Sequence, residues 1–95
     1  MSQVTLSQVP VPHDGIELAE LEGEGVLYCH EKLSMIYMNE SASAIWRLCD
    51  GHRSVAEIIS ALAEAFPDTA ADISIDVRET LGLLVSEGVL ELVGE

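Results

Sequence analysis

The histidines and cysteines are the first candidates for metal binding or nucleophilic chemistry, and the sequence has five of them: His13, Cys29, His30, Cys49 and His52. Cys49 and His52 have a Cys-x-x-His spacing that could supply two ligands to zinc, whereas a structural zinc site usually needs four. Cys29 and His30 are adjacent in a segment with strand character, so their side chains point to opposite faces and cannot easily both join the first pair. The sequence therefore predicts no metal site and two buried thiols.

Nucleophilic catalysis has no recognisable basis in this chain. No Gly-x-Ser-x-Gly elbow occurs, and neither cysteine has a neighbouring cationic cluster that would lower its pKa. No phosphate-binding Gly-x-x-x-x-Gly-Lys sequence is present. Acidic pairs such as Glu22 and Glu24 lie in a predicted turn and are expected to be solvated. We therefore expect no catalytic residues, no cofactor and no enzyme activity.

The charge balance excludes several classes of partner. The 95 residues include 17 acidic and 4 basic side chains, which gives a formal net charge of −13. Nucleic acids and anionic membranes are bound mainly through basic side chains, so neither is an expected partner. A hydrophobic content of 48% is too high for a disordered acidic tail. The sequence shows no secretory signal or membrane-spanning run, and its cysteines indicate a reducing compartment, so we expect a cytoplasmic protein.

Residues 1–15 contain two prolines and a His-Asp-Gly turn. We interpret them as an N-terminal arm, either loose or docked on a partner. Residues 16–93 then form one domain. Its first part alternates short apolar runs with turns at 23–25 and 31–32, which predicts an antiparallel meander of three strands over residues 16–22, 26–30 and 33–38.

The pattern changes to a helical period after the third strand. Asn39 is expected to cap a first helix, which ends at Asp50-Gly51. Ser54 and Glu57 have the spacing of a capping box, so they predict the start of a second helix, which ends at Pro67.

A third helix begins between Thr69 and Ser74 and ends at Gly88, before a short last strand over residues 89–93. Each helix has an apolar face, formed by Ala42, Ile45, Leu48 and Cys49 in the first, by Val55, Ile58, Ile59, Leu62, Ala63 and Phe66 in the second, and by Ile73, Val77, Leu81, Leu84 and Val85 in the third. The predicted fold is α+β and similar to a winged helix-turn-helix: a three-stranded antiparallel sheet followed by three helices.

The predicted strand 33–38 is apolar on both faces, with Leu33, Met35 and Tyr37 on one and Ser34, Ile36 and Met38 on the other. A strand with one solvated face needs only one apolar face. Either the N-terminal arm covers the second face, or the strand is an exposed edge that can pair with an incoming peptide strand. The outward N–H groups then belong either to Met35 and Tyr37 or to Ser34 and Ile36.

Gly82 is the second anomaly, because glycine inside a helix costs about 1 kcal/mol relative to alanine. It shares a stripe with Arg78 and Val85 beside the apolar face of the third helix. The missing side chain either allows a neighbouring helix to approach closely or leaves a groove for the backbone of another chain.

Several short runs of the sequence occur in the order that one known family shows. They are Val26-Leu27-Tyr28, Ile36 to Ala42, Ala44-Ile45-Trp46, Leu48 to Ile58, Phe66-Pro67, Asp76-Val77, Leu81 and Gly88-Val89-Leu90. Over residues 25–92 the chain resembles the PqqD family, with Met38 in place of the usual leucine.

The resemblance implies a recognition element for ribosomally made and post-translationally modified peptides (RiPPs). Such a domain is a non-catalytic adaptor that resembles a winged helix. The leader segment of a precursor peptide adds as a strand to the third strand and lies against the third helix. The domain then presents the precursor to a modifying enzyme, often a radical S-adenosylmethionine enzyme. On this resemblance the candidate peptide-binding residues are Leu33, Ser34, Met35, Ile36, Tyr37, Arg78, Gly82 and Val85.

Two other functions fit the expected fold. One is a winged-helix transcription regulator, although the third helix offers a single cation among several acids. The other is a small structural or dimerisation subunit of an enzyme complex, and a homodimer is among the associations expected for the chain.

Overall fold

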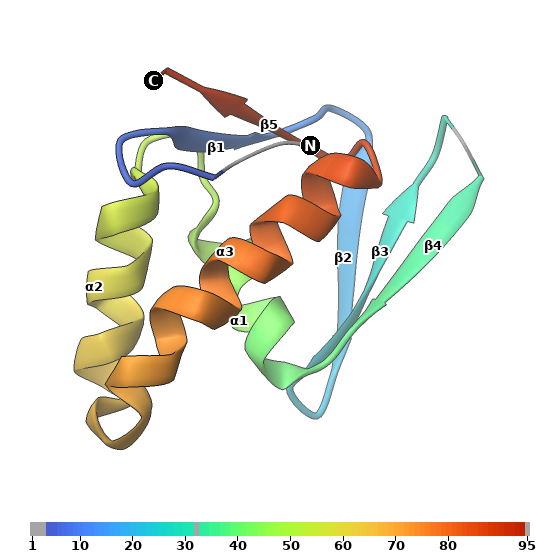
Figure 1. The fold of residues 1–95 in the computed structure, drawn as a ribbon. Helices are drawn as coiled ribbons and strands as arrows, with labels where there is room; N and C mark the ends of the chain where they lie inside the picture. The colour runs from blue at the N-terminus through green and yellow to red at the C-terminus, as the bar shows by residue number, and fades with distance from the viewer. Residues whose placement is uncertain (1–3, 32, 95) are drawn as a thin grey trace.

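The computed structural model describes residues 4–31 and 33–94. Along the chain the elements are β1 (Val9–Pro12), β2 (Ile16–Leu21), β3 (Glu24–Cys29), β4 (Ser34–Met38), α1 (Glu40–Leu48), α2 (Val55–Ala65), the 3-10 helix η1 (Pro67–Thr69), α3 (Ala70–Ser86) and β5 (Leu90–Val93) (Figure 1). The α+β fold class is confirmed, and the predicted meander is the sheet β2-β3-β4. A second, two-stranded sheet of β1 and β5 was not predicted.

The turn between β2 and β3 lies one residue earlier than the sequence predicted. Glu22 and Gly23 both have positive φ, 53° and 88°, and they form a two-residue loop. This pair of left-handed residues suits the right-handed twist of a hairpin, so Glu24 and Gly25 join β3. Lys32 of the other predicted turn lies outside the described residues. Leu33 has a φ of 52° and precedes β4, so its expected place in the strand was wrong.

The N-terminal segment does not form a separate arm over Val9–Pro12. These residues are β1, which pairs antiparallel with β5. The amide of His13 donates to the carbonyl of Val89 at 3.0 Å, so odd-numbered residues of β1 bond to β5 by the alternation of an antiparallel ladder. The two prolines therefore occupy positions whose missing N–H would point away from β5, as in an edge strand.

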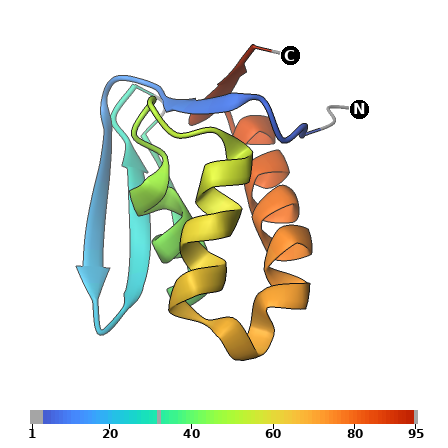
Figure 2. The ribbon, with the colours of Figure 1, turned by 90° about the vertical axis from the view of Figure 1, so that its left-hand side faces the viewer.

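The segment before β1 covers the start of α2. The amides of Val55 and Ala56 donate to the carbonyls of Gln8 and Leu6, at 2.8 and 3.0 Å. The first amides of a helix have no partner within the helix, so this contact satisfies groups that would otherwise need water. Figure 2 shows the N-terminal segment passing over α2 at the end where both termini lie.

The sequence predicted both helix caps correctly. The Asn39 side chain accepts a hydrogen bond from the amide of Ala42 at 2.9 Å. Ser54 and Glu57 make both bonds of the capping box, at 3.2 and 2.8 Å. The start of α1 is therefore fixed directly after β4.

The core lies between the sheet β2-β3-β4 and the pair α2 and α3, with α1 between them (Figure 2). Its fully buried side chains include Leu27, Ile45, Val55, Ile58, Val77, Leu81, Leu84 and Leu90. Phe66 was expected on the buried face of the second helix, but it is 53% exposed. The reason is local: α2 ends at Ala65, and Phe66 is its extended C-cap with a φ of −131°.

Gly25 is expected to tolerate no larger residue, because β3 and α1 approach closely at this point. An added Cβ would lie 2.6 Å from Oγ of Ser43 and 2.7 Å from Cδ1 of Leu18. Gly25→Ala should therefore lower the free energy of unfolding by about 1–3 kcal/mol through overpacking. Chemical denaturation followed by circular dichroism measures this loss.

Gly82→Ala is the matched control for that substitution. A Cβ at Gly82 meets no neighbouring atom within 4 Å, so alanine should raise the free energy of unfolding by up to about 1 kcal/mol through its better helix propensity. Equal effects of the two substitutions would contradict the close approach of β3 and α1.

Candidate functional site

Strand β4 is an edge of its sheet. The strand order is β2-β3-β4, and among the described residues β4 pairs with β3 alone. Figure 1 shows β4 at the outer side of the sheet, with α3 crossing in front of the molecule. The N–H and C=O groups on the free side of such a strand can pair with an added strand.

The hydrogen-bonding direction of each residue in β3 follows from its hairpin with β2. Leu21 and Glu24 flank the two-residue loop as partners, and the pair that closes such a loop exchanges main-chain hydrogen bonds. Bonded and non-bonded pairs alternate, so even-numbered residues of β3 bond to β2. The bond from the His30 amide to the Gly15 carbonyl, at 3.2 Å, continues this alternation. Odd-numbered residues of β3 therefore direct their main-chain groups at β4.

The same alternation identifies the free groups of β4. Each odd-numbered residue of β3 lies opposite an even-numbered residue of β4: Gly25 opposite Met38, Leu27 opposite Ile36, and Cys29 opposite Ser34. These even-numbered residues bond to β3, so the N–H and C=O groups of Met35 and Tyr37 point outward. Of the two pairs that the sequence left open, Met35 and Tyr37 are the outward one.

The two faces of β4 have different environments. Met38 is buried and Ile36 is half-buried against the core, whereas Met35 and Tyr37 are 66% and 64% exposed on the opposite face. The described part of the N-terminal segment bonds to α2 and pairs with β5, so these residues do not cover the outer face of the strand. Of the two alternatives that the sequence left open, the exposed edge agrees with the described residues. The Tyr37 hydroxyl donates to Oε1 of Glu24 at 2.6 Å, and this hydrogen bond, with smaller contributions from burial and the Glu24 charge, raises the pKa of Tyr37.

A groove separates β4 from α3. Its cavity has a volume of about 320 Å³, and its walls include Ile36 and Tyr37 of β4 and Asp76, Glu79, Thr80 and Leu83 of α3. We call it the β4–α3 groove. A strand added to β4 would lie along its opening, with alternate side chains directed at α3.

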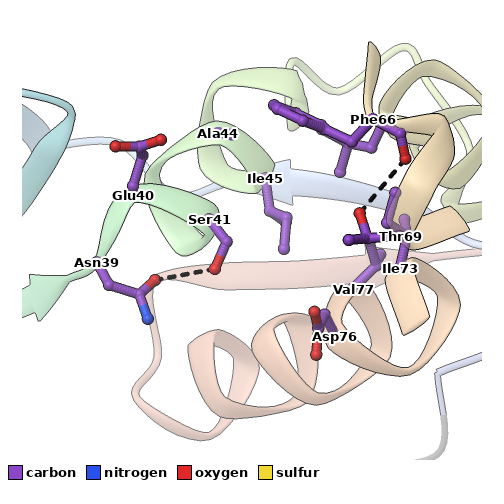
Figure 3. Close-up of a pocket in the computed structure, with 11 residues that line it drawn as sticks. Asn39, Glu40, Ser41, Ala44, Ile45, Phe66, Thr69, Ile73, Asp76 and Val77 are labelled. Atoms are coloured by element: carbon purple, nitrogen blue, oxygen red, sulfur yellow. Dashed lines mark hydrogen bonds between the residues drawn. The ribbon is translucent and has the colours of Figure 1, made fainter. Parts of the chain in front are cut away.

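A second cavity, of about 400 Å³, continues from the end of this groove at Asn39, Ser41 and Asp76, which line both. We call it the α1–α3 pocket. Figure 3 shows residues of α1, of the connection between α2 and α3, and of α3 surrounding it. Its apolar lining includes Ile45, Leu62, Phe66, Ile73 and Val77.

The structure does not place Arg78 and Gly82 beside β4. Both line a third cavity, together with residues 4–7 of the N-terminal segment and with Glu79, which lines the β4–α3 groove as well. Val85 is half-buried against the core. The open space at Gly82 also contradicts close packing of a neighbouring helix as the reason for this glycine.

Helical geometry explains the difference between the expected and observed walls. A helix turns about 100° per residue, so Asp76 and Arg78 lie on opposite flanks of the buried residue Val77. The row Asp76, Thr80 and Leu83, spaced i, i+4 and i+7, faces β4 and was missed. Its spacing was visible in the sequence, but which flank of α3 faces the sheet depends on tertiary packing.

Comparison with known proteins shows the family. The profile described as "Coenzyme PQQ synthesis protein D (PqqD)" matches residues 24–90, which include β4, α1 and all of α3. This chain belongs to the PqqD family. Both walls of the β4–α3 groove lie within the matched part.

Curated relatives of this PqqD-family chain include a PqqA binding protein of Azotobacter vinelandii, which is 36% identical over 97% of this chain and 99% of its own length. A PqqA binding protein of Pseudomonas paraeruginosa is 39% identical over 72% of this chain and 74% of its own length.

Two solved structures have the same fold. One is the PqqD truncation of Methylobacterium extorquens PqqCD, which represents a functional, stand-alone RiPP recognition element. It is 28% identical with a TM-score of 0.77, over 93% of this chain and 94% of that one. The other is TbiB1 in complex with the TbiA(beta) leader peptide. At 21% identity it shows the fold alone, with a TM-score of 0.76 over 90% of this chain and 99% of that one.

The thiols of this PqqD-family chain are free and buried, as the sequence predicted. Burial, with a smaller contribution from Asp50, raises the pKa of Cys49 to about 12, and its Sγ donates to the carbonyl of Ile45 at 3.2 Å. Residues 4–31 and 33–94 include no group of three or more His, Cys, Asp or Glu side chains placed to hold a metal ion. None of their helices is long and apolar enough to span a bilayer.

The raised pKa of Cys49 predicts a loss of stability in alkali. An unfolded cysteine ionises near pH 8.5, whereas the folded thiol stays protonated up to about pH 12. The stabilising contribution is therefore fully present below the unfolded pKa and declines as the pH rises above it, by up to about 1.4 kcal/mol per pH unit. Chemical denaturation at about pH 8 and pH 10 measures the decline. The free energy of unfolding of Cys49→Ala should decline less over this pH range. An equal decline in the variant and the wild type would contradict a protonated Cys49 thiol in the folded protein.

Proposed function

We propose that this protein is a non-catalytic adaptor that binds the leader segment of a ribosomally synthesised precursor peptide and presents it to a modifying enzyme. The observation that carries the proposal is the free edge of β4, which lies beside α3 across an open groove. The names of the relatives, which are PqqA binding proteins, support a peptide as the ligand. The fold shared with a RiPP recognition element supports the same role.

The leader adds to β4 as one more strand. The N–H and C=O groups of Met35 and Tyr37 bond to the peptide backbone and supply affinity, and the groove receives alternate side chains and sets the register. Binding holds the precursor near the enzyme and so raises its effective concentration there. No bond is made or broken on the adaptor.

The proposed peptide-binding residues follow from this placement. On the strand they are Ser34, Met35, Ile36 and Tyr37, with Leu33, 91% exposed, at the strand's beginning. On the helix they are Asp76, Glu79, Thr80 and Leu83 in place of Arg78, Gly82 and Val85.

The enzyme partner that the family resemblance implies is a peptide-modifying enzyme, such as a radical S-adenosylmethionine enzyme, in the cytoplasm. Pairing of β4 with β4 of a second copy would form a homodimer through the same edge, so dimerisation and peptide binding compete in this proposal. The alternative of a DNA-binding regulator has no support from α3. This helix carries several acidic side chains, and Arg78 is the one basic side chain in it.

Amide hydrogen exchange measured by NMR tests the strand addition. The probes are synthetic peptides that span short precursor-like genes next to the gene for this protein. In the free protein the amides of Met35 and Tyr37 should exchange fast, and those of Ile36 and Met38 slowly, because only the latter pair with β3. A binding peptide should slow Met35 and Tyr37 at least about tenfold. Binding that leaves these two amides unprotected would place the peptide elsewhere.

A further inference from the structure

The helical wall of the β4–α3 groove is acidic, and no described side chain supplies a counter-charge to it. Asp76 and Glu79 line the groove, and neither forms an ion pair with another described residue. Two of the chain's arginines are engaged elsewhere, Arg47 with Glu20 and Arg53 with Asp50. The remaining one, Arg78, does not line the groove; it lies in a third cavity that Glu79 also lines, and it forms no ion pair with Glu79. A ligand in the groove therefore meets negative charge that none of the three arginines neutralises.

The groove changes character along its length. Leu83 and Ile36 make one part apolar, whereas Asp76 and Ser41 line the end that opens into the α1–α3 pocket. Side chains of an added strand point at α3 at every second residue, about 6.7 Å apart. Consecutive inward side chains therefore pass an apolar part, then an acidic part, and then the pocket.

The α1–α3 pocket has a largely apolar lining that includes an exposed aromatic side chain. Phe66 lines it and is 53% exposed, although it is large and apolar. The cavity of about 400 Å³ also lies within the size range of small-ligand pockets. In Figure 3 Ile45 projects from α1, Phe66 lies at the end of α2, and Asp76 lies on α3. A large apolar side chain entering here would pass the Asp76 carboxylate.

We propose that the site selects a cationic peptide strand with a large apolar anchor. A lysine or arginine on the inward face of the strand lies against Asp76 and Glu79, and a leucine, methionine or aromatic side chain beyond it fills the α1–α3 pocket. The inference rests on the proposed function, because it names the chemistry of the peptide that adds to β4. The charge sets the choice of peptide, and the anchor fixes its register along the groove.

The preference for a cationic peptide can be tested by selection from a displayed library of random peptides. The peptides should be about twelve residues long, so that a strand of ordinary length fits within them. Peptides that the Met35→Pro variant also retains are discarded. An acidic protein attracts basic peptides non-specifically, so binding to this variant does not depend on the β4 edge. The remainder should be enriched in lysine or arginine next to a large apolar residue. Glutamate in place of that cation should weaken binding at least about tenfold in fluorescence anisotropy.

A double charge reversal, Asp76→Lys with Glu79→Lys, should invert the preference, so that the glutamate peptide binds more tightly than the lysine peptide. The matched control is Glu64→Lys with Glu91→Lys, which changes the net charge equally at exposed positions outside the groove and pocket. The control should keep the original preference. An inversion in both variants, or in neither, would overturn the proposal.

Two substitutions test the anchor. Ala44→Phe fills the α1–α3 pocket from α1, and Thr69→Trp narrows it from an exposed position in η1. Each should weaken the anchored peptide at least about fivefold and have little effect on the same peptide with alanine at the anchor. Circular dichroism shows whether each variant folds. If one variant does not fold, the result for the other variant tests the anchor. If both peptides lose affinity equally, or if neither loses affinity, the proposed anchor in the α1–α3 pocket is wrong.

The outcomes separate this inference from the proposed function. If no peptide is retained by the wild-type chain beyond those retained by Met35→Pro, strand addition to β4 is wrong. If peptides are retained through the β4 edge but show no preference for cations, the adaptor role stands and the inference about the groove fails.

Discussion

Replacing Met35 with proline is expected to weaken peptide binding at least about tenfold while the domain remains folded. The Met35 amide points away from β3, so its loss removes no hydrogen bond within the sheet. Proline at this position removes a donor to the incoming strand, and its ring occupies the approach of that strand. Isothermal titration with a peptide bound by the wild-type chain measures the loss, and circular dichroism checks the fold.

Two controls separate the backbone effect from others. Met35→Ala removes the same exposed side chain and keeps the N–H group, so it should bind nearly as the wild type does. Ile36→Pro removes an amide that bonds to β3 and should destabilise the sheet itself, by about 3 kcal/mol or more if it resembles proline within a helix. Wild-type affinity in a folded Met35→Pro protein would contradict strand addition at this edge.

The local parts of this fold could be predicted because their causes are close in sequence. The Asn39 cap and the Ser54–Glu57 capping box each depend on residues three apart, and both occur as expected. The buried stripes of the helices follow from the helical period in the same way, and Val77 and Leu81 are fully buried. The error at Phe66 also has a local cause, since the helix ends one residue before it.

The parts that the sequence could not predict depend on pairings between distant segments. The Val-Pro alternation of β1 suits an edge strand, but its partner β5 lies at the other end of the chain. The outward direction of the Met35 amide follows from a turn at Glu22 and Gly23, which is separated from β4 by the whole of β3. Which flank of α3 faces β4 is set by how α3 packs on α1 and α2. The sequence therefore predicted the strand β4, but it did not predict that Asp76, Thr80 and Leu83, rather than Arg78 and Gly82, line the groove beside that strand.

The proposed function depends both on the family resemblance and on the three-dimensional arrangement of β4 and α3. The family resemblance implied a peptide site between the third strand and the third helix. In the structure Asp76, Glu79, Thr80 and Leu83 are residues of α3 that line the groove beside β4. This difference affects the expected charge of the groove. The stripe of Arg78, Gly82 and Val85 carries one basic side chain, whereas the observed lining includes the acidic side chains of Asp76 and Glu79.

Leu81→Ala is expected to lower the free energy of unfolding by about 2–5 kcal/mol, the range for emptying a buried large side chain. Leu81 is 0% exposed in α3 and belongs to the core cluster that includes Val77 and Leu84. Its substitution removes apolar contacts and leaves a cavity that the surrounding helices fill incompletely. Chemical denaturation measures the loss, and the slope of the transition shows whether unfolding remains a two-state process.

Phe66→Ala is the comparison that distinguishes core from binding surface. Phe66 is larger than Leu81, but it is 53% exposed at the rim of the α1–α3 pocket, so its truncation should cost less than about half as much. A loss as large as that of Leu81→Ala would mean that Phe66 packs in the core. If Phe66 instead forms part of the anchor site, its truncation should weaken the anchored peptide more than it weakens the fold, because the apolar contact that it makes is with the ligand.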